Sequence, residues 1–192
     1  MMVPSAKKQQ IIQEKTNVIN QHLEKKLLTK SLDKNIKTLK ELFEDDDTFI
    51  TRQVINNHQP DLSFFLAYSD PMANSFVVNE NIVKPLMYSK IKENSIDYLL
   101  HQVVLIPEAK KARSCLEIVN AISYGDTVLL ANGSDEALIL NTKGFTARGI
   151  AEPDNEKVLS GPREGFAESL IPNLCLIRRR LRTNDLKLKY IT

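Results

Sequence analysis

Two short apolar runs on either side of an Asn-Gly dipeptide constrain the fold of this chain more than any other feature. The runs are TVLLA (residues 127–131) and ALIL (residues 137–140), and Asn132-Gly133 follows the first of them. Asn-Gly suits turns that need positive φ at consecutive positions, and it is typical of β-hairpins. The sequence therefore predicts a β-hairpin, which commits this part of the chain to a sheet.

Upstream of the hairpin the chain begins its regular structure with a helix and two strands. Residues 32–43 carry apolar side chains at helical spacing, and Ser31 can cap the start of that helix. The acidic run 44–47 ends it, because carboxylates are unfavourable at a helix C-terminus, and we expect this run to be a solvated helix end. Residues 49–55 and 61–68 are aromatic and apolar enough to be strands.

Helical and strand-like segments continue to alternate as far as Gly125. We expect a helix over 73–87 that is interrupted near Pro85, and one or two helical turns over 95–100. The run HQVVLI (101–106) predicts a further strand, and Pro107 is expected to open a helix that ends at Gly125. Strands alternating with helices predict an α/β fold with a mixed sheet covered by helices.

The ends of the chain are basic and its middle is acidic. Among 192 residues the net charge is +2. Residues 1–30 contain six lysines against two acidic residues, and residues 163–192 contain seven basic residues against three acidic ones. We interpret residues 1–30 as a basic mobile arm or a loosely held helix. Charged ends of this size are usually solvated surfaces.

The two cysteines indicate neither a disulfide framework nor a zinc site. Cys115 and Cys175 each lie in an apolar helical context and are far apart in the sequence. Both are expected to be buried in a reducing compartment. No apolar run approaches the ~20 residues that span a bilayer, and the N-terminus lacks a signal-peptide core. The expectation from the residues is a soluble chain that is not exported.

The last helix is expected to run over 161–182. Gly161 and Pro162 suit its N-cap and first position. Apolar residues then recur on one face: Phe166, Leu170, Leu174, Ile177 and Leu181. Pro172 falls inside this pattern and should bend or split the helix. The basic run Arg178-Arg179-Arg180 falls in the final turns, where cations interact favourably with the helix dipole.

No group of residues predicts catalysis, a metal site or a cofactor. The three histidines, His22, His58 and His101, lie in separate elements and have no second ligand at metal-binding spacing. No nucleophile elbow or phosphate-binding loop is present. The arginines at 178–180 could contact nucleic acid, but no aromatic residues interleave with them. The favoured interpretations of that run are a favourable charge at the helix end and contact with an acidic partner surface.

A series of motifs in fixed order extends from residue 125 to residue 188. Its members outside the last helix are Gly125, Asp126, Arg148, Glu152 and Pro153. Those in and around the last helix are Gly161, Pro162, Arg163, Glu164, Gly165, Phe166, Glu168, Asn173, Arg178, Arg179 and Arg180. This series resembles the A-subunit family of bacterial spore germinant receptors. The segments 32–43, 61–68 and 81–87 fit the same family in order.

The resemblance implies a soluble region of two α/β subdomains, followed by transmembrane helices. This chain would then comprise a first subdomain (31–160), a connecting helix (161–182) and the start of an incomplete second subdomain (183–192). Pro172 departs from the family pattern, and we expect the membrane spans to lie beyond Thr192. The full receptor would reside in the spore inner membrane, with this region on the cytoplasmic side. No enzymatic activity and no cofactor are implied.

The resemblance also implies partners and a role. The partners would be the B and C subunits of the receptor and other A subunits, and the stimulus would be a nutrient such as an amino acid or a sugar. We expect the residues Gly161 to Phe166 to form either a joint between the subdomains or a subunit contact, which serves signalling or assembly. Two alternatives remain open: a nutrient-binding module in its own right, and a nucleic-acid-binding protein that uses the basic helix.

Overall fold

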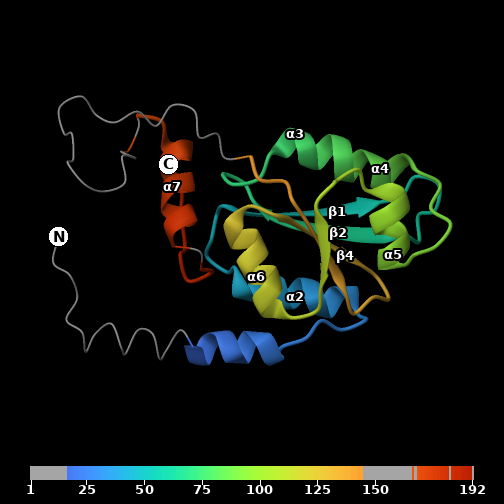
Figure 1. Cartoon of the computed structure of the whole chain (residues 1–192), viewed down its shortest axis with the longest axis horizontal. Helices are drawn as coiled ribbons and strands as arrows, with labels where there is room; N and C mark the ends of the chain where they lie inside the picture. The colour runs from blue at the N-terminus through green and yellow to red at the C-terminus, as the bar shows by residue number, and fades with distance from the viewer. Residues whose placement is uncertain (1–16, 145–165, 167, 182, 192) are drawn as a thin grey trace.

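One five-stranded sheet organises the chain (Figure 1). The computed structural model describes residues 17–144, 166, 168–181 and 183–191. The strand order is β1-β2-β4-β5-β3. The strands are β1 (Phe49–Ile55), β2 (Ser63–Ser69), β3 (Ala109–Ala112), β4 (Thr127–Ala131) and β5 (Ala137–Leu140). The α/β class is therefore confirmed. All four described strand pairings are antiparallel rather than mixed, and short connections impose this on β1–β2 and β4–β5.

Helices cover both faces of this sheet, and side-chain alternation divides the core into two layers. Phe64 and Leu66 of β2 belong to the cluster under the helical segments of residues 75–103. Phe65 and Ala67 point to the other face, where they pack with α2 (Leu32–Leu42) and α6 (Cys115–Tyr124). Because both faces are buried, β2, β4 and β5 are almost continuously apolar.

The predicted hairpin is present as β4 and β5. Val128 lies opposite Ile139, and Leu129 opposite Leu138. Its turn differs from the expected one in a single respect: only Gly133 has positive φ, at 83°. Five residues, 132–136, separate the strands, so the turn is longer than the two-residue loop that needs positive φ at both positions.

Two long helices lie on the same face of the sheet. Ser31 caps α2 as expected, since its side chain accepts a hydrogen bond from the Lys34 N–H. The expected start of α6 at Pro107 is wrong. Ser114 and Glu117 form a capping box in which each side chain accepts from the other residue's backbone N–H. The residues after Pro107 instead form the edge strand β3.

The opposite face is covered first by a continuous helical segment around Pro85. It consists of α3 (Ser75–Val78), the π-helical turn η1 (Asn79–Val83) and α4 (Lys84–Tyr88). The expected interruption at Pro85 does not occur, because Lys84 keeps helical angles (φ −59°, ψ −49°).

The π-helical turn explains how the proline is accommodated. The Lys84 N–H donates to the Asn79 carbonyl, five residues earlier. Pro85 has no N–H for the Asn81 carbonyl, which accepts instead from the Leu105 N–H at 2.9 Å. The Asn81 side chain returns a bond to the Leu105 carbonyl at 3.0 Å. A neighbouring segment thus replaces the lost helical hydrogen bond.

The strand expected at 101–106 is wrong. Residues 96–98 form α5 (Ile96–Tyr98), and the π-helical turn η2 (Leu99–Val103) continues it. Leu99 and Val103 are buried in the same cluster as Phe64. A short apolar run does not distinguish a buried strand from a buried helical turn, and packing decided this one.

The N-terminal part of the chain is partly helical and is tied to the sheet. Residues 17–25 are helical, and Leu23 is buried. The Leu28 N–H donates to the Arg113 carbonyl at 2.8 Å, and the Gly133 N–H donates to the Lys30 carbonyl at 3.0 Å. Residues 26–30 are therefore attached to the β3–α6 connection and the hairpin turn. The expected boundaries at residues 30, 160 and 182 remain predictions.

Candidate functional site

The acidic run between α2 and β1 folds into a turn in which Asp46 is buried and Glu44, Asp45 and Asp47 are exposed. Asp46 is 7% exposed, and its Oδ1 accepts from the Thr48 N–H at 3.1 Å and from the Thr48 hydroxyl at 2.7 Å. Asp45 takes φ of +64°. Phe43 and Phe49 stack across the turn with ring centroids 4.4 Å apart. The expectation of a solvated helix end is wrong for Asp46, whose carboxylate points into the protein.

Arg178 enters this turn from α7 (Leu170–Arg180). Its Nη2 donates to Asp46 Oδ2 and to the Thr48 hydroxyl, the latter at 2.5 Å. The side chains of Arg178 and Asp46 are 2% and 1% exposed, and Thr48 is fully buried. Removing one partner of such a buried pair leaves an uncompensated charge, which typically costs about 3–5 kcal/mol. Arg178 is thus an internal anchor and not a surface contact.

The rest of α7 is attached beside it through a small buried patch. Leu174, Cys175 and Leu176 are buried, and the Cys175 thiol donates to the Pro71 carbonyl at 2.5 Å. Burial raises the pKa of the Cys175 thiol. The helix also contacts α6 (Figure 1). Three consecutive residues of α7 are thus buried, and of these three the expected stripe included only Leu174.

The helix is shorter than predicted, and its apolar stripe lies differently. It begins at Leu170 after an extended Ser169, so Pro172 falls in the first turn, where its missing N–H costs nothing. The expected bend at Pro172 is wrong for this reason. Phe166, Leu170 and Leu181 are 71%, 56% and 53% exposed, so most of the predicted buried stripe faces outward.

The segment after α7 returns to the same acidic turn. The Asp47 N–H donates to the Leu188 carbonyl at 2.8 Å, and Asp47 Oδ2 accepts from the Tyr190 N–H at 2.7 Å. Lys189 Nζ lies 2.6 Å from Asp45 Oδ1. This contact with Lys189 lowers the pKa of Asp45 and raises that of Lys189. Three consecutive aspartates thus each bind a different part of the C-terminal region.

Further polar contacts extend this junction along the end of α2. The Leu42 carbonyl accepts from Asn184 Nδ2 at 3.2 Å and from Lys187 Nζ at 2.9 Å. Lys187 also lies 5.9 Å from the centre of the Phe43 ring. We call the residues 42–48, α7 and 183–191 together the junction. It satisfies the C-terminal carbonyl of α2 and links residues that are 130 or more positions apart.

The predicted site residues are only partly brought together. Several of them lie outside the described residues: Gly161, Pro162, Arg163, Glu164, Gly165, Arg148, Glu152 and Pro153. Phe166 and Glu168 are exposed ahead of α7. Arg178 belongs to the junction. Arg179, Arg180 and Asn173 all make contacts of their own, with Arg180 exposed.

Gly125 and Asp126 have roles in the fold. Gly125 ends α6 in the left-handed conformation with φ of +99°, and a Cβ placed there would lie 2.9 Å from the Met72 carbonyl oxygen. Asp126 forms an ion pair with Lys143. Glycine is required here by both conformation and space. The local fold thus accounts for both Gly125 and Asp126, and neither needs a role at the expected joint between subdomains.

Sequence reasoning missed the acidic half of the junction. Asp46 and Thr48 complete the site, yet no ligand motif marks them. The only signal in the sequence was the presence of one acidic run (44–47) and one basic run (178–180). Runs of like charge are more often solvated than buried, so this signal was weak. Their meeting depends on how α7 packs beside α6.

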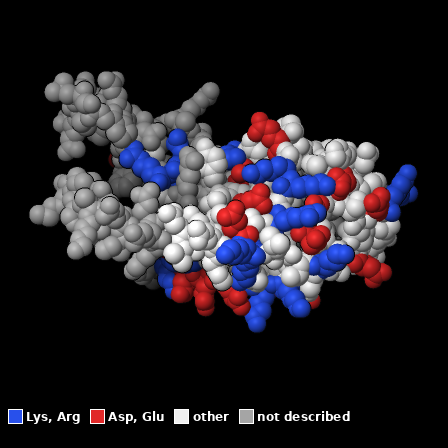
Figure 2. Space-filling model, turned by 60° about the horizontal axis from the view of Figure 1, so that its bottom comes forward, with Lys and Arg blue, Asp and Glu red and all other residues white. Residues whose placement is uncertain are grey.

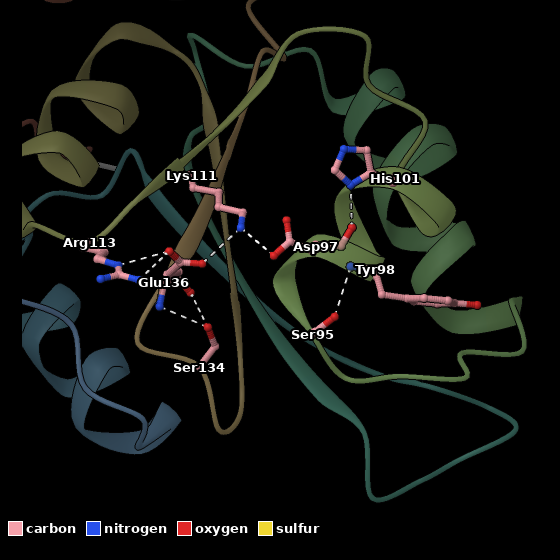
Figure 3. A network of polar contacts seen from close by, with 8 residues as sticks. All are labelled: Ser95, Asp97, Tyr98, His101, Lys111, Arg113, Ser134 and Glu136. Atoms are coloured by element: carbon pink, nitrogen blue, oxygen red, sulfur yellow. Dashed lines mark hydrogen bonds and ion pairs between the residues drawn. The ribbon is translucent and has the colours of Figure 1, made fainter.

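A second cluster of charges joins β3, the hairpin turn and α5 (Figure 3). Lys111 Nζ lies 2.6 Å from Asp97 Oδ2 and 3.4 Å from Glu136 Oε2. Arg113 Nη2 lies 2.9 Å from Glu136 Oε1. The hydrogen bond from Lys111 lowers the pKa of Asp97. His101 contacts the Asp97 carbonyl instead of a carboxylate. These exposed pairs fix surface geometry and contribute little stability.

Neither cluster forms a catalytic or metal-binding arrangement. Within the described residues no group of three or more His, Cys, Asp or Glu side chains could hold a metal ion. In that same part of the chain no helix is long and apolar enough to cross a membrane. On the face drawn in Figure 2, basic and acidic side chains are interspersed and do not form one continuous basic surface. The structure is therefore an α/β domain whose C-terminal helix α7 is attached through the buried Arg178–Asp46 pair.

The chain belongs to the family described as the Bacillus/Clostridium GerA spore germination protein, whose model matches residues 37–192. It is 30% identical over 163 residues to spore germination protein KA of Bacillus subtilis (strain 168), covering 83% of this chain and 30% of that protein. It is 29% identical to spore germination protein A1 of the same strain, covering 74% of this chain and 28% of that protein. The chain thus spans about a third of the length of these relatives or less.

A solved structure confirms the fold. The N-terminal domain of the A subunit of the Bacillus megaterium spore germinant receptor GerK3 superposes with a TM-score of 0.63 at 19% identity. The superposition covers 85% of this chain and 59% of that chain. The resemblance to the germinant-receptor A-subunit family is therefore confirmed.

Proposed function

We propose that this chain is a non-catalytic portion of a germinant-receptor A subunit that acts in signalling or in receptor assembly. The relatives named for spore germination support the process, and the GerK3 domain supports the subunit type. The proposed location is the spore inner membrane, with this region on the cytoplasmic side. The proposed partners are the B and C subunits and further A subunits.

The buried pair of Asp46 and Arg178 carries this proposal. It fixes α7, and with it the chain that follows, to the body of the sheet. A movement of either part would then be transmitted to the other, because a buried ion pair resists partial separation. We place the transmission path through the junction. The residues Gly161 to Phe166, including Arg163 and Glu164, stay within this proposal as the adjoining joint.

Germination of spores that carry variant receptors tests the proposal. Arg178→Met and Asp46→Asn, each introduced into the intact gene, should slow nutrient-triggered germination or reduce the amount of receptor in spore membranes. A germination defect at normal receptor level would favour signalling, and a loss of receptor would favour assembly. Lys84→Met is the matched control, since Lys84 is exposed and its ion pair within the described residues is with half-buried Glu80 of the same helical segment.

Two outcomes would contradict the proposal. One is normal germination with normal receptor level in both junction variants. The other is an equal defect in the Lys84→Met control, which would show that any loss of a charged side chain has this effect. Arg163→Ala and Glu164→Ala, tested in the same way, address the joint separately.

A further inference from the structure

A pocket lies between the segment of residues 26–29 and the helix α2. Its volume is ≈ 320 Å³, at the lower end of the usual range for small-molecule sites. Cys115, the first residue of α6, also lines it and is buried. None of the lining residues belongs to the junction, so the pocket calls for a separate explanation.

Hydrogen bonds fix the backbone on the 26–29 side of the pocket. The Cys115 N–H donates to the Lys26 carbonyl at 2.9 Å. At the other end of the segment, the buried Asn35 side chain donates to the Thr29 carbonyl at 2.6 Å and accepts from the Thr29 N–H at 2.9 Å. A ligand would therefore meet a wall that is already in place and would lose little affinity to ordering it.

The α2 wall supplies donors that the protein itself does not use. Its lining residues recur at spacings of three and four, which places them on one face of the helix: Lys34, Lys37, Thr38 and Glu41. Lys34 and Lys37 are exposed, and neither side chain makes a hydrogen bond or ion pair with any other described residue. The Thr38 hydroxyl likewise has no partner in the described part of the chain.

A third cation comes from the opposite wall. Lys26 is half-buried, and its ammonium makes no hydrogen bond or ion pair within the described residues. Burial raises the pKa of the Cys115 thiol, and the charge of Lys26 partly opposes this rise. The Lys26 charge therefore acts on the inner lining of the pocket. Two separate segments thus direct positive charge to one hollow.

The charges of the lining are uneven in number and in position. Three ammonium groups face one carboxylate, that of Glu41, so the lining carries a net charge of +2. Glu41 lies seven residues after Lys34, which is about 10.5 Å along the helix axis. The positive charge is therefore concentrated toward the beginning of α2, away from Glu41.

We propose that this pocket binds a phosphate monoester whose organic part is small and apolar. A phosphate monoester carries a charge of about −1.5 to −2 at pH 7 and offers three terminal oxygens, which matches three unpaired ammonium groups. A carboxylate has a single charge and would leave most of the positive charge uncompensated. The organic part contacts Leu27, which is 60% exposed, and Cys115. The inference goes beyond the proposed function and does not depend on it.

Chemical-shift titration of the ¹⁵N-labelled 192-residue chain tests the inference, with phenyl phosphate as the probe. Saturable shifts are expected at the amides of residues 26–29 and 34–41 and of Cys115. Phenyl sulfate has the same shape and a single negative charge. It should bind at least about tenfold more weakly, because it gains less from the three ammonium groups.

A second arm of the experiment distinguishes the sources of a phosphate monoester. Phosphatidic acid presents the same group at a lipid surface, so the chain is mixed with phosphatidylcholine vesicles that contain it. Cosedimentation that phenyl phosphate displaces would assign the bound group to a lipid headgroup. Without such cosedimentation, binding of phenyl phosphate would assign the group to a soluble molecule.

Variants locate the site. Lys34→Met and Lys37→Met should each weaken phenyl phosphate binding at least about fivefold, a moderate loss because both side chains are exposed. Glu41→Gln should strengthen binding at least about twofold, since it removes a like charge from the lining. Lys40→Met is the matched control: it removes an exposed lysine of α2 that does not line this pocket, and it should leave binding unchanged.

Four results would overturn the inference. The first is the absence of saturable shifts at millimolar phenyl phosphate, and the second is equal binding of phenyl sulfate. The others are unchanged binding by Lys34→Met and Lys37→Met, and a loss in Lys40→Met as large as theirs. All of these side chains are exposed, so the variants are expected to fold, and an unchanged spectrum away from the pocket checks this. The germination outcome for the junction variants has no bearing on any of these results.

Discussion

Arg178 and Asp46 form a buried ion pair although 132 residues separate them in the chain. Thr48 closes the arrangement, because its hydroxyl donates to Asp46 and accepts from Arg178. Arg178 Nε has no partner among the described residues, so the pair is not fully satisfied. Such an arrangement specifies one position for α7 more than it adds net stability.

Loss of either charge should therefore destabilise the domain. We expect Arg178→Met and Asp46→Asn each to lower the free energy of unfolding by about 3–5 kcal/mol. The double variant should lose less than the sum, since both changes remove the same interaction. Urea denaturation followed by circular dichroism measures all three. Strict additivity would mean that the two side chains do not interact in solution.

Acid should release the C-terminal segment from the turn before the domain unfolds. Lys189 lowers the pKa of Asp45 below its ordinary value of 3.8. The contact is therefore complete above pH 3.8 and is lost as the pH falls through the lower, folded-state value. Amide chemical shifts of Lys189 and Tyr190 should report this transition. In Asp45→Asn the transition should be absent, and an unchanged transition in that variant would assign it to another group.

Gly125 should not tolerate a side chain. Gly125→Ala forces a left-handed residue to carry a Cβ that meets the Met72 carbonyl oxygen, and we expect a loss of at least about 2 kcal/mol. Gly133→Ala is the control, since its φ is also positive but nothing lies within 4 Å. That variant should lose only about 1 kcal/mol. Equal losses in thermal unfolding would contradict a role for the Met72 contact.

The attachment of residues 26–30 should contribute to the core although it precedes the part of the chain that the family model matches. Leu28 is 6% exposed and packs with Phe65 and Ile118, so Leu28→Ala should cost about 2–4 kcal/mol. Leu27 is 60% exposed, and Leu27→Ala should change stability by less than about 0.5 kcal/mol. A neutral Leu28→Ala would show that this segment is not held in solution.

Local signals predicted several elements well. Ser31 and the periodic apolar residues after it identified α2, and the two apolar runs around Gly133 identified β4 and β5. Ser114 and Glu117 have the spacing of a capping box, and the expected start at Pro107 overlooked this local signal. Where one apolar run could be strand or helix, as at 101–106, local sequence was insufficient.

The candidate site was predicted less well than the fold. The basic run was recognised, yet Arg178 was assigned to the surface and Asp46 to a solvated helix end. Charge and spacing do not reveal burial when the partner is more than 100 residues away.

The sequence by itself determined the α/β class, the hairpin, the capped helix α2 and the family, since each depends on residues close together in the chain or on motifs in fixed order. Only the tertiary structure decided that β2 pairs with β4 and β3 with β5, that Pro85 lies within a continuous helical segment, and that Arg178 is buried against Asp46. Each of these depends on a distant segment that supplies a strand, a hydrogen bond or a counter-charge, and local propensity contains no information about such partners.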